Sequence, residues 1–242
     1  MRTQFAVAAA TGLLLATSAC AKESATDASS SASTSSAAAS SSPTRAKTVD
    51  EVLDLTWPSY EPAGSELQAE VVSTEAPLKL PESTSTSKAG VPTGFPKTPE
   101  GALAQLKAVD EAGMEGLNGE TARAVFTDSF ESGNPDFYQR SWIGPLTDKF
   151  SESRPGSYTA TLNVSQGLIR GATDDGSFVL VCVVGKLQIV SKHDTQTVPA
   201  PDCEGMRWDG KRWMVVPRDT LAPDVSPHSS EAYRLGFRDL ES

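Results

Sequence analysis

Histidine and cysteine are scarce in this chain, with two His and three Cys among 242 residues. The histidines, His193 and His228, are too few for a multi-histidine metal centre within one chain. No P-loop, His-Glu-x-x-His helix, Gly-x-Ser-x-Gly elbow or dinucleotide fingerprint occurs. Asp174-Asp175-Gly176-Ser177 lacks the remaining acids of a calcium loop and predicts a turn instead. We therefore expect no metal, no cofactor and no enzymatic activity.

Positive charge is also in short supply. The chain has 21 Lys and Arg against 31 Asp and Glu, a formal net charge of −10. A protein that binds nucleic acid needs a basic face to neutralise phosphates. The charge balance therefore speaks against a nucleic-acid partner, although it leaves room for a local basic patch.

Apolar residues make up 38% of the chain and aromatic residues 7%. The apolar share is below the usual 45–50%, a count that also includes Gly. Ser, Ala and Thr nearly fill residues 25–44, which no packed core can use. A single domain of roughly 140 residues with long flexible flanks fits this composition better than two cores.

The first twenty residues resemble an export signal. Arg2 gives a positive start, and Phe5–Ala16 is an apolar run too short to span a bilayer comfortably. Thr17-Ser18-Ala19-Cys20 then resembles a bacterial lipobox, with Thr17 where Leu is usual. This predicts a lipoprotein signal peptide over 1–19, lipidation of Cys20, and attachment to the extracytoplasmic face of the cell membrane through the lipid. The alternative is an ordinary secretory signal that is cleaved near Ala19.

The segment 20–48 has the composition of a flexible, solvated tether. The segment 49–97 is an extended, Pro-rich wrap, in which six prolines forbid a long helix. Within it, Trp57 and Tyr60 are expected to pack on the domain that follows, or else to form a partner-binding motif.

The predicted domain over 98–242 begins with helices. Thr98-Pro99-Glu100 supplies a cap, a first-turn proline and an acid near the positive end of the dipole, and Gly113 and Gly116 end this helix. Asn118 caps a second helix. A third runs from Asn134-Pro135 to Gly144-Pro145.

Strand patterns begin after Pro155. They cover Tyr158–Val164, weakly Gly167–Ala172, then Phe178–Val190 with a bend near Gly185. Ser191–Cys203 is expected to be a loop. An Asp209-Gly210 hairpin over 206–216 pairs Trp208 with Trp213, and a terminal helix covers Ser230–Leu240. Helices followed by antiparallel strands indicate an α+β fold.

With Cys20 lipidated, two cysteines remain. In an exported domain Cys182 and Cys203 most simply form one disulfide, which closes a loop of about 20 residues and contributes about 3 kcal/mol in the chain-entropy model. A buried reduced thiol at Cys182 is the alternative. A catalytic thiol is disfavoured, because an apolar strand raises the pKa of a thiol.

Two resemblances make the expected fold and the expected cellular location more specific. Helices before a sheet that closes with Trp208-Asp209-Gly210-Lys211-Arg212-Trp213 resemble the nuclear-transport-factor-2-like cone, in which N-terminal helices pack on a curved antiparallel sheet. The run Gly94-Phe95-Pro96-Lys97-Thr98-Pro99-Glu100-Gly101-Ala102, with Cys203-Glu204-Gly205-Met206, resembles an uncharacterised exported and lipoprotein family of high-GC Gram-positive bacteria. This second resemblance covers about Trp57 to Val216. It implies an envelope role, with a link to conjugative elements in several relatives, and no activity.

The basic cluster near the end of the sheet is the one candidate partner surface. It consists of Arg207, Trp208, Lys211, Arg212 and Trp213. Solvated strand ends with stacked tryptophans are the alternative interpretation.

Three functions follow from these patterns. The first is a lipid-anchored, non-enzymatic envelope protein that contacts protein partners, which a filled interior with an exposed apolar patch would favour. The second is a small-ligand carrier, which a roomy apolar pocket would favour. The third is an enzyme, which a polar pair facing into such a pocket would favour.

Overall fold

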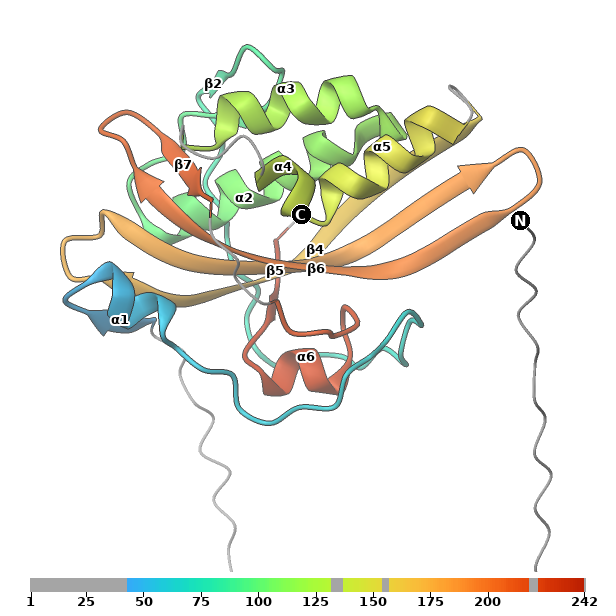
Figure 1. Ribbon diagram of the computed structural model, residues 1–242. Coiled ribbons are helices and arrows are strands. Elements are labelled where there is room, and N and C mark those ends of the chain that lie inside the picture. The colour runs from blue at the N-terminus through green and yellow to red at the C-terminus, as the bar shows by residue number, and fades with distance from the viewer. Residues whose placement is uncertain (1–42, 132–136, 154–156, 218–221, 242) are drawn as a thin grey trace, which may run out of the picture. The chain divides into compact units, whose positions relative to one another are not determined.

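The computed structural model describes residues 43–131, 137–153, 157–217 and 222–241. Their elements in chain order are β1 (Thr44–Ala46), α1 (Val49–Leu53), β2 (Ser85–Thr86), β3 (Pro92–Thr93), α2 (Pro99–Met114), the 3-10 turn η1 (Glu115–Leu117), α3 (Gly119–Ser129), α4 (Phe137–Arg140), α5 (Ile143–Ser153), β4 (Tyr158–Thr173), β5 (Phe178–Ser191), β6 (Thr195–Trp208), β7 (Trp213–Val216), α6 (Ser230–Arg234) and β8 (Arg238–Asp239). The α+β class is confirmed. Helices α2 to α5 lie on one face of a curved sheet, together with β2, whereas α1, α6 and the first part of the extended segment lie on the other (Figure 1).

The main sheet is antiparallel except at one edge. Its strand order is β1-β4-β5-β6-β7, with β8 also paired to β4. Strand β1 is parallel to the end of β4, so residues 44–46 of the predicted tether form a strand of the sheet. Strands β4 and β5 pair almost from end to end and lie in the central part of the sheet.

Two strand predictions were wrong. The segments Tyr158–Val164 and Gly167–Ala172 form one strand, β4, which continues through register shifts between Val164 and Gln166 and between Ile169 and Gly171. Ser191–Cys203 is not a loop, because most of it belongs to β6, which pairs with β5 along its whole length. Pro199 and Pro201 fit in β6 because no described strand pairs with its outer side at these positions.

The predicted caps of the first two helices are confirmed. The Thr98 side chain accepts a hydrogen bond from the Gly101 amide at the start of α2, and Asn118 accepts from Glu120 and Thr121 at the start of α3. The predicted third helix is wrong in its end. Gly144-Pro145 does not stop a helix but lies in the first turn of α5, where proline is tolerated. The predicted cap at Asn134-Pro135 lies outside the described residues.

The terminal helix is shorter than predicted. Helix α6 ends at Arg234, because Gly236 adopts a φ of 97° and the amides of Gly236 and Phe237 bond back to the carbonyls of Tyr233 and Ala232. These two bonds form the helix-ending Schellman motif. The chain then turns into β8 and returns to the edge of β4.

The extended segment packs on the sheet, as predicted for its aromatic residues. The Trp57 ring stacks on Phe237 with 6.4 Å between centroids, and the Arg170 guanidinium lies 3.5 Å from the Trp57 ring centroid. Arg170 also donates to the Leu55 and Thr56 carbonyls. Tyr60 packs against the same apolar cluster and its hydroxyl accepts from the Asp224 amide at 3.4 Å.

The residues that carry the family resemblance have structural roles. Gly94 adopts a φ of 77°, and a Cβ there would lie 2.4 Å from the Thr84 hydroxyl. A Cβ at Gly101 would lie 2.1 Å from the Pro96 carbonyl oxygen, which also accepts a 2.9 Å hydrogen bond from Trp213 Nε1. The motif therefore fastens the start of α2 to the hairpin that ends the sheet.

Candidate functional site

A groove of about 780 Å³ runs beside helix α2 at the β4 edge of the sheet. One wall is the face of α2 that carries Ala104, Ala108 and Ala112, and a second wall comes from Leu80, Pro81, Pro92 and Phe95. The residues of β4 that line it are Ala160, Thr161, Leu162 and Asn163. The volume lies within the range of known ligand pockets.

The β4 edge in this groove has no strand partner among the described residues. Strand β5 pairs with Tyr158–Val164 on the inner side, whereas β8 reaches only Gln166 and Gly167 and β1 only Gly171–Thr173 on the outer side. The Val164 amide points outward, because it donates to the Glu111 carboxylate at 3.1 Å. Backbone groups alternate along a strand, so the amides and carbonyls of Ala160 and Leu162 point outward as well.

The opposite edge of the sheet is protected. Strand β7 pairs only with Gly205–Trp208, which leaves the first part of β6 as an edge in the described structure. Pro199 and Pro201 lie in this part and offer no amide to an incoming strand. Ala160 and Leu162 carry no such block, so the two edges differ in their capacity to pair.

The charged side chains of the groove are mostly acidic. Glu111, Glu115 and Glu241 contribute carboxylates, and Lys107 contributes the one ammonium group among the lining residues. Lys107 forms an ion pair with Glu111 one helical turn away. The groove therefore offers a field that attracts cations.

A buried pair of carboxyl groups lies between α2 and β6. Asp110 is 2% exposed, and its Oδ2 atom has no hydrogen-bond partner. Burial, and then the nearby carboxylates of Asp202 and Glu111, raise the pKa of Asp110 well above its usual range. Burial also raises the pKa of Asp202 to about 7. Neither residue lines the groove, so the pair belongs to the packing of helix against sheet.

No sequence pattern singled out this pair, and Asp202 falls within Ser191–Cys203, for which a loop was expected. A signal was present, because Asp110 follows Leu103 and Leu106 at seven and four residues and so falls on the buried stripe of α2.

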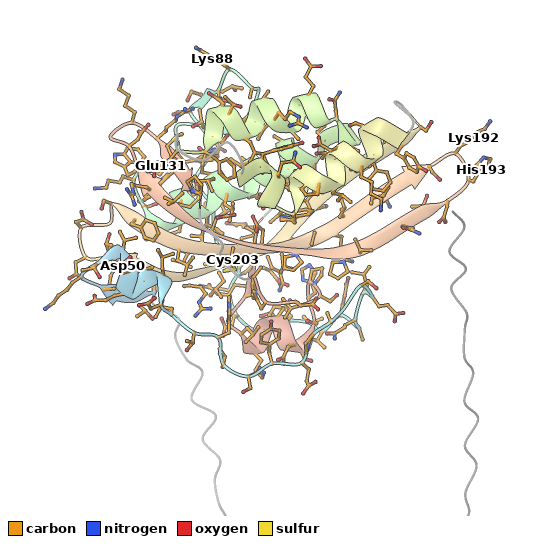
Figure 2. The ribbon with its side chains drawn as sticks, in the orientation of Figure 1. Asp50, Lys88, Glu131, Lys192, His193 and Cys203 are labelled. Carbon is orange, nitrogen blue, oxygen red and sulfur yellow. A yellow bond between two sulfur atoms is a disulfide. The ribbon has the colours of Figure 1, made fainter. Side chains whose placement is uncertain are left out.

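Cys182 and Cys203 lie directly opposite each other in β5 and β6, in a geometry compatible with a disulfide. They face the side of the sheet that α6 covers, and they pack with Val184, Leu168 and Phe237. Figure 2 shows Cys203 at the sheet, on the side toward α6. This position has no groove beside it in the described cavities, which is consistent with a structural role.

The basic hairpin surface is largely paired within the protein. Arg212 donates to the Asp128 backbone carbonyl at 2.7 Å and forms an ion pair with its carboxylate, and Arg207 lies 3.4 Å from Glu131. Trp213 is buried, and its ring meets Trp208 edge-on at 5.4 Å. The cross-strand Trp pair is confirmed. Lys211 is exposed in the turn, where its amide bonds to Asp209.

The other residues considered for site chemistry lie in turns or outside the described residues. Cys20 lies outside the described residues. His193 is exposed at the tip of the β5–β6 turn, next to Lys192 and away from the helices (Figure 2). Asp175 caps its own turn by accepting bonds from Thr173 and Ser177, which lower its pKa to about 2. In the described part of the chain no group of three His, Cys, Asp or Glu is placed to bind a metal.

Comparison of the chain with family models, with curated proteins and with solved structures found no match. Within the residues that the structure covers, no helix has the length and apolar character needed to cross a membrane.

Proposed function

We propose that this protein is a lipid-anchored, non-enzymatic binding module of the cell envelope, and that the groove between α2 and the β4 edge is its binding site. The observation that carries the proposal is the position of the groove. It lies at the edge of the sheet, where it is accessible to another molecule, and it combines apolar walls with unpaired backbone groups.

The packing behind the groove supports a binding role rather than catalysis. Between α2 and the sheet the space is filled by apolar side chains, among them Leu103, Leu106 and Val181. The polar pair with raised pKa values, Asp110 and Asp202, is separate from the groove lining. An enzyme in a hollow between helices and sheet is therefore the less well supported function.

For the fold we retain the nuclear-transport-factor-2-like cone as a proposal. Long antiparallel strands with helices α2 to α5 on one face support it (Figure 1). The groove lies at the margin of the main apolar cluster, whose members Phe95, Ala104 and Leu162 line it.

The anchor is tested by replacing Cys20 with Ser. We expect the variant to leave the membrane fraction for the soluble fraction, because a diacyl anchor supplies the two chains that stable attachment needs. Fractionation followed by immunoblotting measures this, with Ser18→Ala as the control that keeps the lipobox cysteine. Unchanged membrane retention of Cys20→Ser would contradict lipidation.

The binding site is tested by crosslinking in cells of the natural host. A photoreactive amino acid at Ala108 in the groove is expected to give a discrete adduct with an envelope polypeptide. The matched control is the same replacement at Ala124, an exposed alanine of α3. Equal patterns at both positions, or no adduct at Ala108, would count against the groove as a protein-binding site.

A small-ligand carrier is the second candidate, and the volume of about 780 Å³ favours it. Native mass spectrometry of protein purified from its host would then show a bound molecule of low mass, and filling the groove by Ala108→Trp would remove it.

A further inference from the structure

We propose that the groove takes an extended polypeptide segment as an added strand along Tyr158–Asn163 of β4, and that this segment carries Lys or Arg side chains. The inference rests on the proposed function, since it names the ligand class of the same groove. It adds the backbone geometry of binding and the charge of the partner.

The outer edge of β4 at the groove carries backbone hydrogen-bonding groups that no described strand uses. Ala160 and Leu162 turn their amides and carbonyls away from β5 and toward the groove, and no strand pairs with them among the described residues. Their side chains point out of the plane of the sheet and into the core, and each residue is 5% exposed. Backbone groups on an open strand edge have no protein partner, so an added strand would supply hydrogen bonds to them.

The groove limits the length of the added strand. At one end the Glu111 carboxylate already bonds the Val164 amide, and beyond it Leu240 donates to the Ser165 carbonyl at 2.9 Å. The six residues Tyr158–Asn163 remain, a length of about 20 Å at the rise of a strand. A segment of five or six residues therefore fits between Glu111 and the start of β4.

The walls of the groove determine which side chains a bound segment can carry. The alanines of α2 leave room for small or medium apolar groups at alternate positions on the groove side. Glu115 and Glu241 are exposed at the groove, and no ion pair joins either of them to another described residue. A cationic side chain in the segment would meet these carboxylates, whereas an acidic one would be repelled.

Charge also argues against a second copy of this chain as the occupant. Two copies that paired edge to edge through this groove would bring their carboxylates together. The chain as a whole carries a formal net charge of −10, which adds repulsion between copies. A separate, basic polypeptide is the better match.

The experiment uses the full-length protein in detergent and three fluorescent hexapeptides, with a fourth peptide that alternates Val and Glu for the charge test. One alternates Val and Lys, and two further copies of it are N-methylated, either at every Val or at every Lys. In an added strand only alternate amides face β4. We therefore expect one methylated peptide to bind at least about tenfold more weakly than the parent and the other to bind nearly as well. Fluorescence anisotropy measures all three.

Three protein variants test whether the peptides bind in the groove. Ala108→Trp should abolish binding, while Ala124→Trp, the same change on an exposed face of α3, should leave it unchanged. The double charge reversal Glu115→Lys with Glu241→Lys should shift the preference from the Val-Lys peptide to a Val-Glu peptide by about tenfold or more.

The outcomes separate this inference from the proposed function. Equal loss from both methylation patterns would overturn strand addition, and equal affinity for the Val-Glu peptide would overturn the charge assignment. No peptide binding at about 1 mM would overturn the inference as a whole, as would dimers in sedimentation that Ala108→Trp disrupts. If the crosslink at Ala108 in cells persists in those cases, the groove is still a binding site with a different ligand.

Discussion

Replacing both Cys182 and Cys203 by Ala is expected to lower the free energy of unfolding by about 3 kcal/mol. The two residues are 21 positions apart in sequence and directly opposite in β5 and β6. A covalent link there restricts the unfolded chain, because it closes a loop from Cys182 to Cys203 that contains the larger part of both β5 and β6. Urea denaturation of the double variant against the natural protein, both under oxidising conditions, measures the difference.

The location of the pair predicts where the loss appears first. From Thr195 to Glu204, β6 is held in the sheet by β5 alone among the described strands, since β7 begins to pair at Gly205. Without the link this edge is expected to open more often, so the amides of β6 should exchange hydrogen faster than those of β4. Hydrogen exchange with mass spectrometry resolves the two strands.

Reductant provides the control. The natural protein should lose the same stability in dithiothreitol, whereas the double alanine variant should be indifferent to it. If two thiols titrate in the untreated natural protein and reductant changes nothing, the cysteines are reduced and the disulfide prediction is wrong.

Local signals predicted much of the fold. The caps at Thr98 and Asn118 and the Trp208–Trp213 hairpin follow from a few neighbouring residues each, and all of them are present. The errors share a cause, which is that the deciding partner lies far away in sequence. Ser191–Cys203 was expected to be a loop, but most of it pairs with β5, and Pro199 and Pro201 are acceptable there because no described strand pairs with β6 on its outer side at these positions.

The candidate site depended even more on distant contacts. The groove is formed by α2, by the segment around Leu80 and Pro92, by β4 and by Glu241, which no local pattern connects. The Schellman turn at Gly236 could have been predicted from the sequence, because Gly after a short helix is a usual stop signal. It was missed because Phe237 and Leu240 continue the helical spacing of Ala232 and Tyr233. Those two apolar residues instead pack from β8 and its flanks onto opposite clusters.

Asp110 shows how a polar residue on an apolar stripe becomes informative. Its neighbours in α2 are buried, and Asp202 reaches the same interface from β6. The protonated forms are favoured because burial disfavours the charged form of each carboxyl group, and repulsion from the carboxylates of Asp202 and Glu111 adds to this effect at Asp110. A pair of this kind makes stability depend on pH at values where most carboxyl groups no longer titrate.

We expect the free energy of unfolding to fall as pH rises from about 4 through about 7. The pKa of Asp202 is about 7 in the folded protein against 3.8 for the unperturbed group, and that of Asp110 is raised as well. The folded state therefore binds more protons than the unfolded state across this window, so the stabilisation is complete below the unfolded value and is lost as pH rises through the folded one. The difference for Asp202 corresponds to at most about 4 kcal/mol.

Asp110→Asn is expected to remove the part of this dependence that comes from Asp110. The amide carries no charge and takes up no proton, whereas burial still raises the pKa of Asp202. Urea denaturation at pH 5 and pH 8 should show a variant that is more stable than the natural protein at pH 8 and similar to it at pH 5. Asp194→Asn, an exposed position in the β5–β6 turn, is the matched control and should change neither value. A variant that is equally destabilised at both pH values would show that the Asp110 carboxylate is ionised and well solvated, and the proton-sharing interpretation of this interface would be wrong.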